Sequence, residues 1–329
     1  MIITRTPFRI SFAGGGTDLR SFYSNDYGQV LSTTINKYIY VVVKKQIGIV
    51  EHKYRINWST VEFKNNIDEI EHPIVKEVLK KFKIDFPIEI STFADIPPNT
   101  GLGSSSAFTV GLLSAIYALF GKIVTKYQLA AEAAEIEVDI LRRNIGKQDH
   151  FACTYGNLNI FTFLPNETVE VEPVFYKVET LKAIQENTLL FYTALKRDAS
   201  DILKTQNKSS KNIRESLIKL RDLSPKMKEV VSKGKNINDI GKILHESWII
   251  KKNISNSISS KKIDTYYNKA LKAGALGGKI LGAGGGGFLL LYVQKNKQKK
   301  VIKALSELFL LDFNFDTSGT RITYYDNNP

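Results

Sequence analysis

The stretch PPNTGLGSSSAF, residues 97–108, places flexible and hydroxyl-bearing residues directly before an apolar run. Gly101 and Gly103 let the backbone come close to a ligand, because glycine has no Cβ to clash. The serines at 104–106 would lie in the first turn of a helix, where unpaired N–H groups and partial positive charge attract anions. We therefore expect an anion site here, most simply for the phosphates of a nucleotide. A serine cap after a glycine-rich turn is the simpler alternative.

This segment is not a Walker P-loop, because it lacks the lysine of the GxxxxGK[ST] pattern. Any magnesium ion and the charge that balances a nucleotide must therefore be held by other groups. The Ala- and Glu-rich helix expected at 126–143 offers carboxylates for this purpose. They are Glu132, Glu135, Glu137 and Asp139. For most of them a solvated helix face is the alternative.

Two further glycine loops flank this segment in the chain. Residues 13–18, AGGGTD, follow a strand-like run, and Asp18 could accept hydrogen bonds from substrate hydroxyls. Residues 282–287, GAGGGG, contain the letters GxGxxG, but they precede a strand-like run instead of opening a helix. That order excludes a dinucleotide fingerprint and favours a loop that lines a site made from both domains. A tight turn and a flexible strand entry are the respective alternatives.

Composition places limits on the class of protein. The chain has 329 residues, of which 43% are hydrophobic and 24% charged, and this is typical of a globular protein of two domains. Its net charge of +13 favours anionic partners or reflects a lysine-rich genome. A single cysteine, Cys153, excludes an internal disulfide, and the four scattered histidines show no zinc spacing. With no signal-peptide pattern and no long apolar run, we expect a cytoplasmic protein that does not bind membranes.

The elements that must position these loops alternate irregularly between strand and helix, which predicts an α+β fold with two domains, 1–170 and 171–329. An apolar helix at 107–120 should be buried, because no face of it is polar. Strand patterns occur at 5–12, 30–43, 49–63, 87–93, 156–163, 188–195, 288–293 and in the tail near 320–325. Other helical patterns occur at 73–82, 198–222, 225–233, 236–253, 262–274 and 296–308.

The three glycine loops in this order resemble the GHMP kinase superfamily. The matching stretches are PFRISFAGGGTD at 7–18, PPNTGLGSSSA at 97–107 and KILGAGGGGF at 279–288. Within the superfamily, the chain looks like the sugar 1-kinases of the D-glycero-D-manno-heptose 7-phosphate kinase type, and L-fucokinase is similar. The resemblance implies an N-terminal domain like ribosomal protein S5 domain 2, a ferredoxin-like C-terminal domain, and ATP bound between them.

The resemblance also implies roles for individual residues. Asp149 matches the catalytic aspartate, and Arg9 stands where the family commonly has lysine, so a lysine-dependent mechanism is in doubt here. Ser105 and Glu137 match the ligands of Mg²⁺, with Glu135 as the weaker alternative. The residues implied to bind ATP are Pro98, Gly101, Leu102, Gly103, Ser104, Ser105 and Ser106.

The substrate should be a small sugar phosphate, with Asp18 on its hydroxyls and an arginine on its phosphate. Arg197, next to Lys196, and Arg20 are the candidates, although either could be an ordinary surface charge. The full set expected to bind substrate is Gly15, Gly16, Thr17, Asp18, Arg20, Arg197, Gly284 and Gly285.

The leading hypothesis is an ATP- and Mg²⁺-dependent kinase that phosphorylates the anomeric hydroxyl of heptose 7-phosphate. The product would be a 1,7-bisphosphate for nucleotide-activated heptose and surface polysaccharide. L-fucokinase or another hexose 1-kinase, and a superfamily decarboxylase, are alternatives. A nucleic-acid-binding protein is a more distant one, because the basic segment 204–214 lacks the aromatic residues that stack on bases. The sequence leaves the oligomeric state open, with a homodimer as one outcome.

Overall fold

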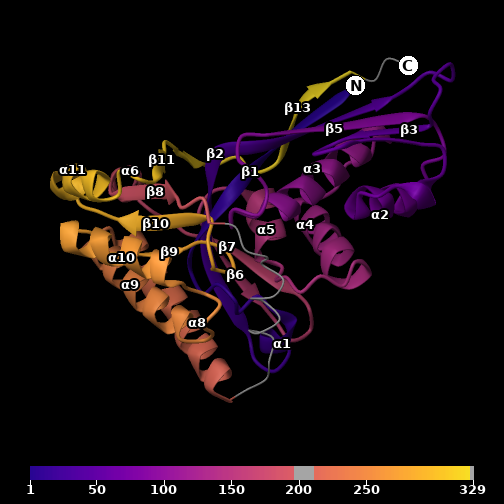
Figure 1. Ribbon diagram of the computed structural model, residues 1–329. Coiled ribbons are helices and arrows are strands. Elements are labelled where there is room, and N and C mark those ends of the chain that lie inside the picture. The colour runs from indigo at the N-terminus through magenta and orange to yellow at the C-terminus, as the bar shows by residue number, and fades with distance from the viewer. Residues whose placement is uncertain (196–210, 327–329) are drawn as a thin grey trace.

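The computed structural model describes residues 1–195 and 211–326 of the chain. These residues form a nine-stranded and a four-stranded sheet, each covered by helices (Figure 1). The large sheet is built mainly from the first half of the chain, with β12 and β13 added from its end, and the small sheet comes from the second half. The α+β, two-domain prediction is confirmed.

The large sheet has the strand order β13-β1-β2-β5-β3-β4; β6 and β12 also pair with β2, and β7 pairs with β6. Its two long central strands pair antiparallel from Ile2 opposite Val43 to Ala13 opposite Leu31, and they are rich in β-branched residues. The strands are β1 (Ile2–Ala13), β2 (Gly28–Lys45), β3 (Tyr54–Asn57), β4 (Val61–Lys64), β5 (Ile88–Ala94), β6 (Asn159–Phe163), β7 (Val169–Pro173), β12 (Phe315–Asp316) and β13 (Arg321–Tyr325).

Helix α3 (Ser104–Leu119) packs directly on β1 and β2 and is buried over most of its length, as its apolar sequence predicts. Gly111 permits this close contact, because a Cβ there would lie 2.9 Å from the Thr6 hydroxyl. Thr4 also donates a hydrogen bond to the Gly111 carbonyl at 2.9 Å. The other helices of this half are α1 (Arg20–Tyr23), η1 (Ile67–Glu69), α2 (Pro73–Lys81), α4 (Lys126–Ala134), the π-helix η2 (Glu135–Ile140) and α5 (Gln148–Tyr155).

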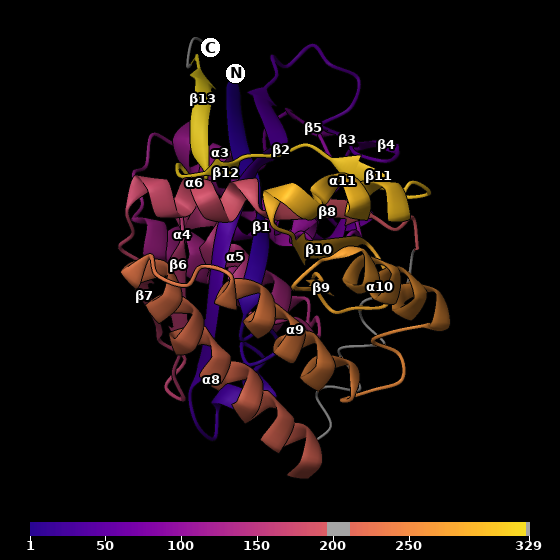
Figure 2. The ribbon, with the colours of Figure 1, turned by 90° about the vertical axis from the view of Figure 1, so that its left-hand side faces the viewer.

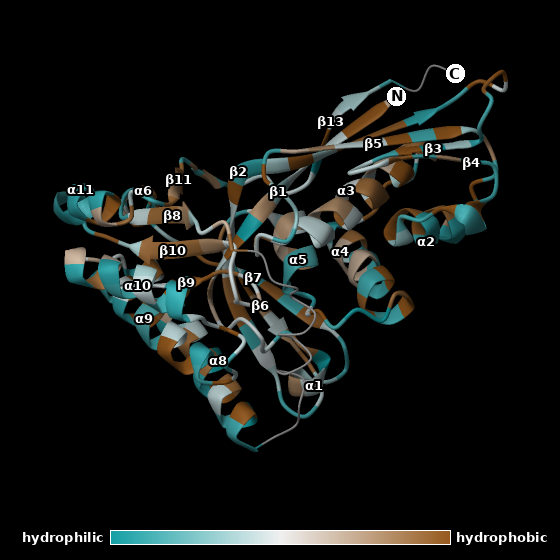
Figure 3. Ribbon diagram, in the orientation of Figure 1, coloured by the Kyte–Doolittle hydropathy of each residue, from teal (hydrophilic) through white to brown (hydrophobic). Residues whose placement is uncertain are grey.

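The small sheet has the order β11-β8-β10-β9, and all its pairs are antiparallel. Its strands are β8 (Thr188–Tyr192), β9 (Gly277–Ile280), β10 (Phe288–Tyr292) and β11 (Phe309–Leu311). Figure 3 shows hydrophobic residues along β10 and hydrophilic ones over much of α10 and α11. The helices are α6 (Val178–Glu186), α8 (Lys211–Lys233), α9 (Asp239–Lys252), α10 (Lys261–Ala273) and α11 (Lys295–Ala304), and Figure 2 shows α8 and α9 side by side.

Several elements differ from the sequence-based predictions. The strand expected at 49–63 is a hairpin, β3 and β4, joined by a turn at 58–60. The helix expected at 126–143 changes to a π-helix at Glu135 and ends at Ile140. The separate helix expected at 225–233 continues from the preceding segment as α8, with Pro225 inside it.

The end of the chain returns to the first half of the molecule. Strand β13 pairs with β1, so Tyr325 lies opposite Ile2 and the two termini are close together (Figure 1). Strand β12 pairs with β2 in the same sheet. Within the described residues, no helix is long and apolar enough to cross a membrane.

Candidate active site

The second and third glycine loops meet backbone to backbone at the junction of the two sheets. A Cβ on Gly282 would lie 2.6 Å from the Cα of Gly101, and one on Gly287 would lie 2.2 Å from the Thr100 carbonyl. Gly101 and Gly282 also have positive φ angles of 83° and 70°. Only glycine satisfies both the short contact and the backbone angle at these positions.

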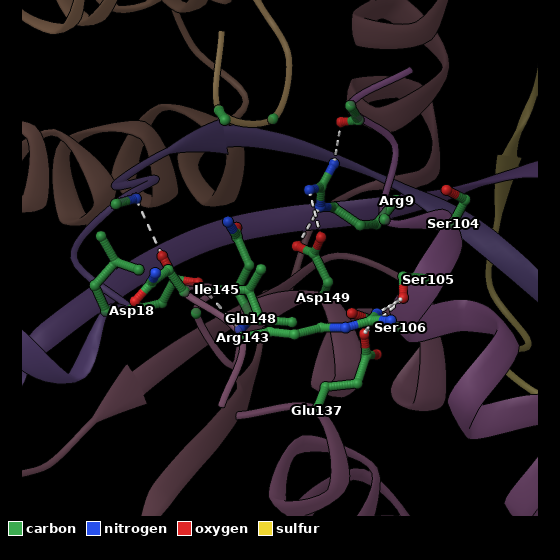
Figure 4. A pocket seen from close by; sticks show the side chains of 18 of the residues that line it. Arg9, Asp18, Ser104, Ser105, Ser106, Glu137, Arg143, Ile145, Gln148 and Asp149 are labelled. Carbon is green, nitrogen blue, oxygen red and sulfur yellow. Dashed lines mark hydrogen bonds and ion pairs between the residues drawn. The ribbon is translucent and has the colours of Figure 1, made fainter. Parts of the chain in front are cut away.

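A cavity of about 530 Å³ lies beside this junction (Figure 4). Ten residues that the sequence singled out line it: Arg9, Gly16, Asp18, Gly101, Gly103, Ser104, Ser105, Ser106, Glu137 and Asp149. The fold therefore brings most of the candidate ATP-binding, metal-binding and catalytic residues to one cavity.

The N-terminus of α3 opens into this cavity. Its N-cap is Gly103, which has φ 80° and ψ 30° and provides no side-chain cap. A Cβ on Gly103 would lie 3.1 Å from Asp149 Oδ2 and 3.3 Å from Arg9 Cγ, so a larger residue would crowd that carboxylate. The first-turn N–H groups of this long buried helix thus face a space with room for an anion.

Arg9 and Asp149 form a two-point ion pair in the cavity wall. Nε and Nη2 of Arg9 each donate to a different oxygen of Asp149, both at 2.6 Å. The Arg9 side chain is only 3% exposed, whereas that of Asp149 is 21% exposed and can meet a ligand. Burial lowers the pKa of Arg9, but the charge and the hydrogen bonds of Asp149, with smaller contributions from Cys153 and Asp18, together outweigh burial and raise this pKa overall.

Glu137 lies at the floor of the cavity, fully buried in the π-helix. Its Oε2 accepts hydrogen bonds from Ser105 at 2.6 Å and Arg143 at 2.7 Å. Its Oε1 accepts one from Thr109 at 2.9 Å and contacts His150 Nε2 at 3.0 Å. Burial raises the pKa of this carboxyl, yet these four partners outweigh burial and hold the pKa at about 2.

The sequence reading did not single out Arg143, although it belongs to this cluster. Its Nη1 donates to both Ser105 Oγ and Glu137 Oε2 at 2.7 Å, so the guanidinium joins the two expected metal ligands (Figure 4). Gly282 and Ala283 also line the cavity, and they belong to the third glycine loop, which the sequence predicted to line a site. Further lining residues that the sequence did not single out are Leu19, Asn99, Arg142, Asn144, Ile145, Gly146 and Gln148. Most of them belong to the segment RRNIGKQD, whose position between the acidic helix and Asp149 was the available signal.

Asp18 also lines the cavity and is 4% exposed. Its carboxylate accepts hydrogen bonds from the backbone N–H groups of Gly16 at 3.1 Å and Gln148 at 3.3 Å. Gly146 leaves the space for it, since a Cβ there would lie 1.8 Å from Asp18 Oδ2. The pKa of Asp18 is raised, mainly by burial and further by the charge of Asp149.

Several expected site residues do not line the cavity. Arg20 is directed to Asp139 and Glu167, with hydrogen bonds of 2.6 and 2.8 Å. Thr17 and Leu102 are buried within their loops, and Pro98 is exposed on the outside of its loop. The N–H of Gly285 donates to the Ile258 carbonyl at 2.8 Å. Gly15 and Gly284 are the other expected site residues that do not line the cavity. Arg197 lies outside the described residues.

The cavity lies between the two domains and contains a helix N-terminus, the carboxylates of Asp149 and Glu137, and the buried Arg9. These are groups that a phosphotransferase site needs. The comparisons with known proteins agree: GHMP kinases N terminal domain matches residues 71–157, and GHMP kinases C terminal matches 225–310. The chain belongs to the GHMP kinase family and is an ATP-dependent sugar kinase.

Known relatives cover nearly the whole chain. D-glycero-alpha-D-manno-heptose 7-phosphate kinase of Campylobacter jejuni is 31% identical, over 97% of this chain and 98% of that protein. A galactokinase of Pyrococcus furiosus is 25% identical, with 95% of each chain covered. The crystal structure of a D-glycero-D-manno-heptose 1-phosphate kinase from Bacteroides thetaiotaomicron superimposes with a TM-score of 0.81 at 24% identity, covering 99% of this chain and 100% of that one.

Proposed function

We propose that the protein transfers the γ-phosphoryl group of ATP to the anomeric hydroxyl of D-glycero-D-manno-heptose 7-phosphate, giving the 1,7-bisphosphate. The observation that carries this proposal is the position of the Arg9–Asp149 pair, whose carboxylate lies directly beside the N-terminus of α3. A base and a phosphate cradle thus share one cavity. The 31% identity to a heptose 7-phosphate kinase over nearly the whole chain favours this sugar over galactose or fucose.

The residues present fit both ATP and Mg²⁺. Gly101 and Gly103 line the cavity at positions where a Cβ would meet the Leu281 carbonyl at 2.5 Å and Asp149 Oδ2 at 3.1 Å, so the loop keeps its course there only with glycine. Ser104–Ser106 would present the first-turn N–H groups to a triphosphate. Ser105 and Glu137 offer only oxygen donors, which are the ligands that Mg²⁺ prefers, and Mg²⁺ commonly takes just one or two protein ligands beside phosphate oxygens and waters. Bound together, the nucleotide and the ion supply the phosphoryl group and offset its negative charge.

Asp149 orients the anomeric hydroxyl and accepts its proton, a role for which its partly exposed carboxylate is placed. Arg9 cannot act as a base, because its guanidinium remains charged. It instead fixes the direction of the carboxylate through two hydrogen bonds and offsets charge that develops during transfer. Asp18, held by two backbone N–H groups, accepts hydrogen bonds from the other sugar hydroxyls.

Arg197 is our proposed ligand for the 7-phosphate of the sugar. Arg20 is the weaker candidate, because its guanidinium already binds Asp139 and Glu167. A homodimer also remains a proposal, which light scattering of the purified protein would test.

The test is a coupled ADP-release assay with heptose 7-phosphate, L-fucose, mannose and galactose as acceptors, each with and without Mg²⁺. We expect turnover to be highest with heptose 7-phosphate and to need Mg²⁺, and ³¹P NMR of the product should show a new phosphate on C1. Turnover with an unphosphorylated sugar and none with heptose 7-phosphate would refute the substrate. Salt-dependent binding of RNA or DNA without kinase activity would support the nucleic-acid alternative.

A further inference from the structure

Two buried cations tie backbone carbonyls of the two glycine loops that meet at the domain junction. Arg9 Nη1 donates to the carbonyl of Gly101 at 2.6 Å. Lys251 Nζ, from α9 in the other half of the chain, donates to the carbonyl of Gly282. Both glycines line the cavity and pack against each other, so the two cations hold one junction from opposite sides.

Lys251 differs from the buried Arg9 and from Arg143 in its partners. Arg9 is paired with Asp149, and Arg143 is paired with Glu137. Within residues 1–195 and 211–326, the ammonium group of Lys251 forms no ion pair, and its hydrogen-bond partner is a neutral carbonyl. Its positive charge is therefore not neutralised by direct contact with a carboxylate.

Lys251 also lies within electrostatic reach of the catalytic residues. The residue is 5% exposed, and burial is the main cause that lowers its pKa to about 8. Arg9 lowers this pKa further, whereas Asp18 and Asp149 raise it. These couplings put the ammonium group in the same low-dielectric region as the two carboxylates that face the sugar.

Stability does not explain a buried lysine without a carboxylate partner. Removing an ammonium group from water is unfavourable, and one hydrogen bond to a carbonyl only partly compensates for it. An apolar side chain of the same length would fit this place with a smaller desolvation penalty. In a phosphotransferase, however, negative charge enters the site with the nucleotide, and a fixed buried cation is most effective there.

We propose that Lys251 is a positioning residue for phosphoryl transfer, holding Gly282 against Gly101 and adding a positive charge at the loop junction that borders the cavity. The inference rests on the proposed kinase reaction. It gives the C-terminal domain a direct electrostatic part in a cavity whose charged lining residues, in the described part of the chain, come from the N-terminal half.

The chain offers two matched controls. Lys279 is equally buried, but burial and the neighbouring cations Lys251 and Arg9 hold its pKa well below the usual value, and its Nζ donates to the Phe12 carbonyl at 3.3 Å. Lys279→Met therefore removes a buried lysine whose hydrogen bond goes to Phe12 and not to either glycine of the junction. Lys252 follows Lys251 in α9, is partly exposed, and lies 3.6 Å from Asp264.

The experiment compares Lys251→Met, Lys279→Met and Lys252→Met in steady-state kinetics, ATP binding by calorimetry and thermal unfolding. For Lys251→Met we expect kcat to fall about 30-fold, within the range for losing one preorganised charge, with the sugar KM and the ATP Kd changed less than about threefold. Its unfolding midpoint should stay the same or rise. Both controls should keep kcat within about threefold of wild type.

Two results would overturn the inference. One is an unchanged kcat in Lys251→Met. The other is a lower unfolding midpoint in Lys251→Met together with an equal loss of kcat in Lys279→Met, which would show that Lys251 has a purely structural role. If the wild type uses another sugar instead of heptose 7-phosphate, the proposed substrate is wrong. The ratio of kcat between Lys251→Met and wild type is then measured with that sugar, and it tests the role of Lys251. A wild type without turnover on any sugar would overturn both.

Discussion

Arg9 and Asp149 are 140 positions apart in the chain, yet two guanidinium nitrogens each bind a different carboxylate oxygen at 2.6 Å. The third contact of Arg9, to the Gly101 carbonyl, fixes the pair to the loop that opens α3. The carboxylate therefore has a single orientation, directed toward the place where a nucleotide and a sugar would meet. Two substitutions separate the role of each partner.

Asp149→Asn should reduce kcat about 10³-fold, because an amide cannot accept the proton of the sugar hydroxyl. ATP affinity should change less than about threefold, since the α3 N–H groups are untouched. The coupled assay and calorimetry measure the two effects. Unfolding should be recorded in parallel, because the variant leaves buried Arg9 without its counter-ion. A kcat near that of wild type would remove Asp149 from its assigned role.

Arg9→Lys should keep the fold but lower kcat about tenfold, because one ammonium group cannot reproduce the fixed two-point contact. Arg9→Met should be worse and should lower the free energy of unfolding by about 3 kcal/mol, since it leaves Asp149 unpaired. Urea unfolding and kinetics together measure this series. Arg55→Lys is the control, because that exposed pair with Glu89 is 3.6 Å long and contributes little. Equal kcat for Arg9→Lys and wild type would contradict the argument.

Gly146→Ala should raise the KM for the sugar about tenfold or more while leaving the ATP Kd nearly unchanged. The new methyl group would lie 1.8 Å from Asp18 Oδ2, so the carboxylate that we assign to the sugar hydroxyls must move. Gly48→Ala is a suitable control, because nothing lies within 4 Å of its Cβ position and its φ is not positive. An unchanged sugar KM would argue against the role of Asp18.

Local sequence signals were sufficient for the glycine loop at 97–103 and for the helix that follows it. A positive φ favours glycine, and a helix without a polar face must be buried, so both features are visible in residues 97–120. The roles of Asp149, Glu137 and Ser105 were predicted from the resemblance to the GHMP kinase superfamily. The structure brings all three to one cavity.

The surroundings of the site depended on non-local packing. The regular helix expected at 126–143 widens into a π-helix at Glu135, and Arg142 adopts a φ of 51°, so no α-helical periodicity could place Arg143. Lys251 looks like a surface charge in a basic helix, yet it is buried and binds the carbonyl of a loop 31 residues later. Interactions of this kind have no local signature.

Tertiary packing also decided the course of α8. Pro225 suggests a break, because proline removes a hydrogen bond within a helix. The helix nevertheless continues, since Leu223 and Met227 on either side are buried against the rest of the molecule. Ser224 adds a hydrogen bond from its hydroxyl to the Gln29 carbonyl at 3.0 Å.

Arg143→Ala should lower the Mg²⁺ concentration needed for half-maximal activity. The guanidinium donates to both Ser105 Oγ and Glu137 Oε2, so arginine and Mg²⁺ would compete for the same two oxygens. A Mg²⁺ titration of ADP release at saturating substrates measures this directly. Arg142→Ala is the control, because this neighbour lines the same cavity and has no hydrogen bond or ion pair to either oxygen. A higher Mg²⁺ requirement in Arg143→Ala would show that the arginine assists the ion.

Glu137 should make the protein lose stability between about pH 4.5 and pH 2. The pKa of its carboxyl is about 2 in the folded protein and 4.5 in an unfolded chain, so the unfolded chain takes up the proton first as pH falls. This contribution is fully present above pH 4.5 and is lost toward pH 2. Urea unfolding at pH 6, 5, 4 and 3 should therefore show a flatter pH dependence for Glu137→Gln than for wild type. Glu170→Gln, at an exposed position, should keep the wild-type slope, and equal slopes in all three proteins would show that Glu137 is not held ionised by Ser105 and its other partners.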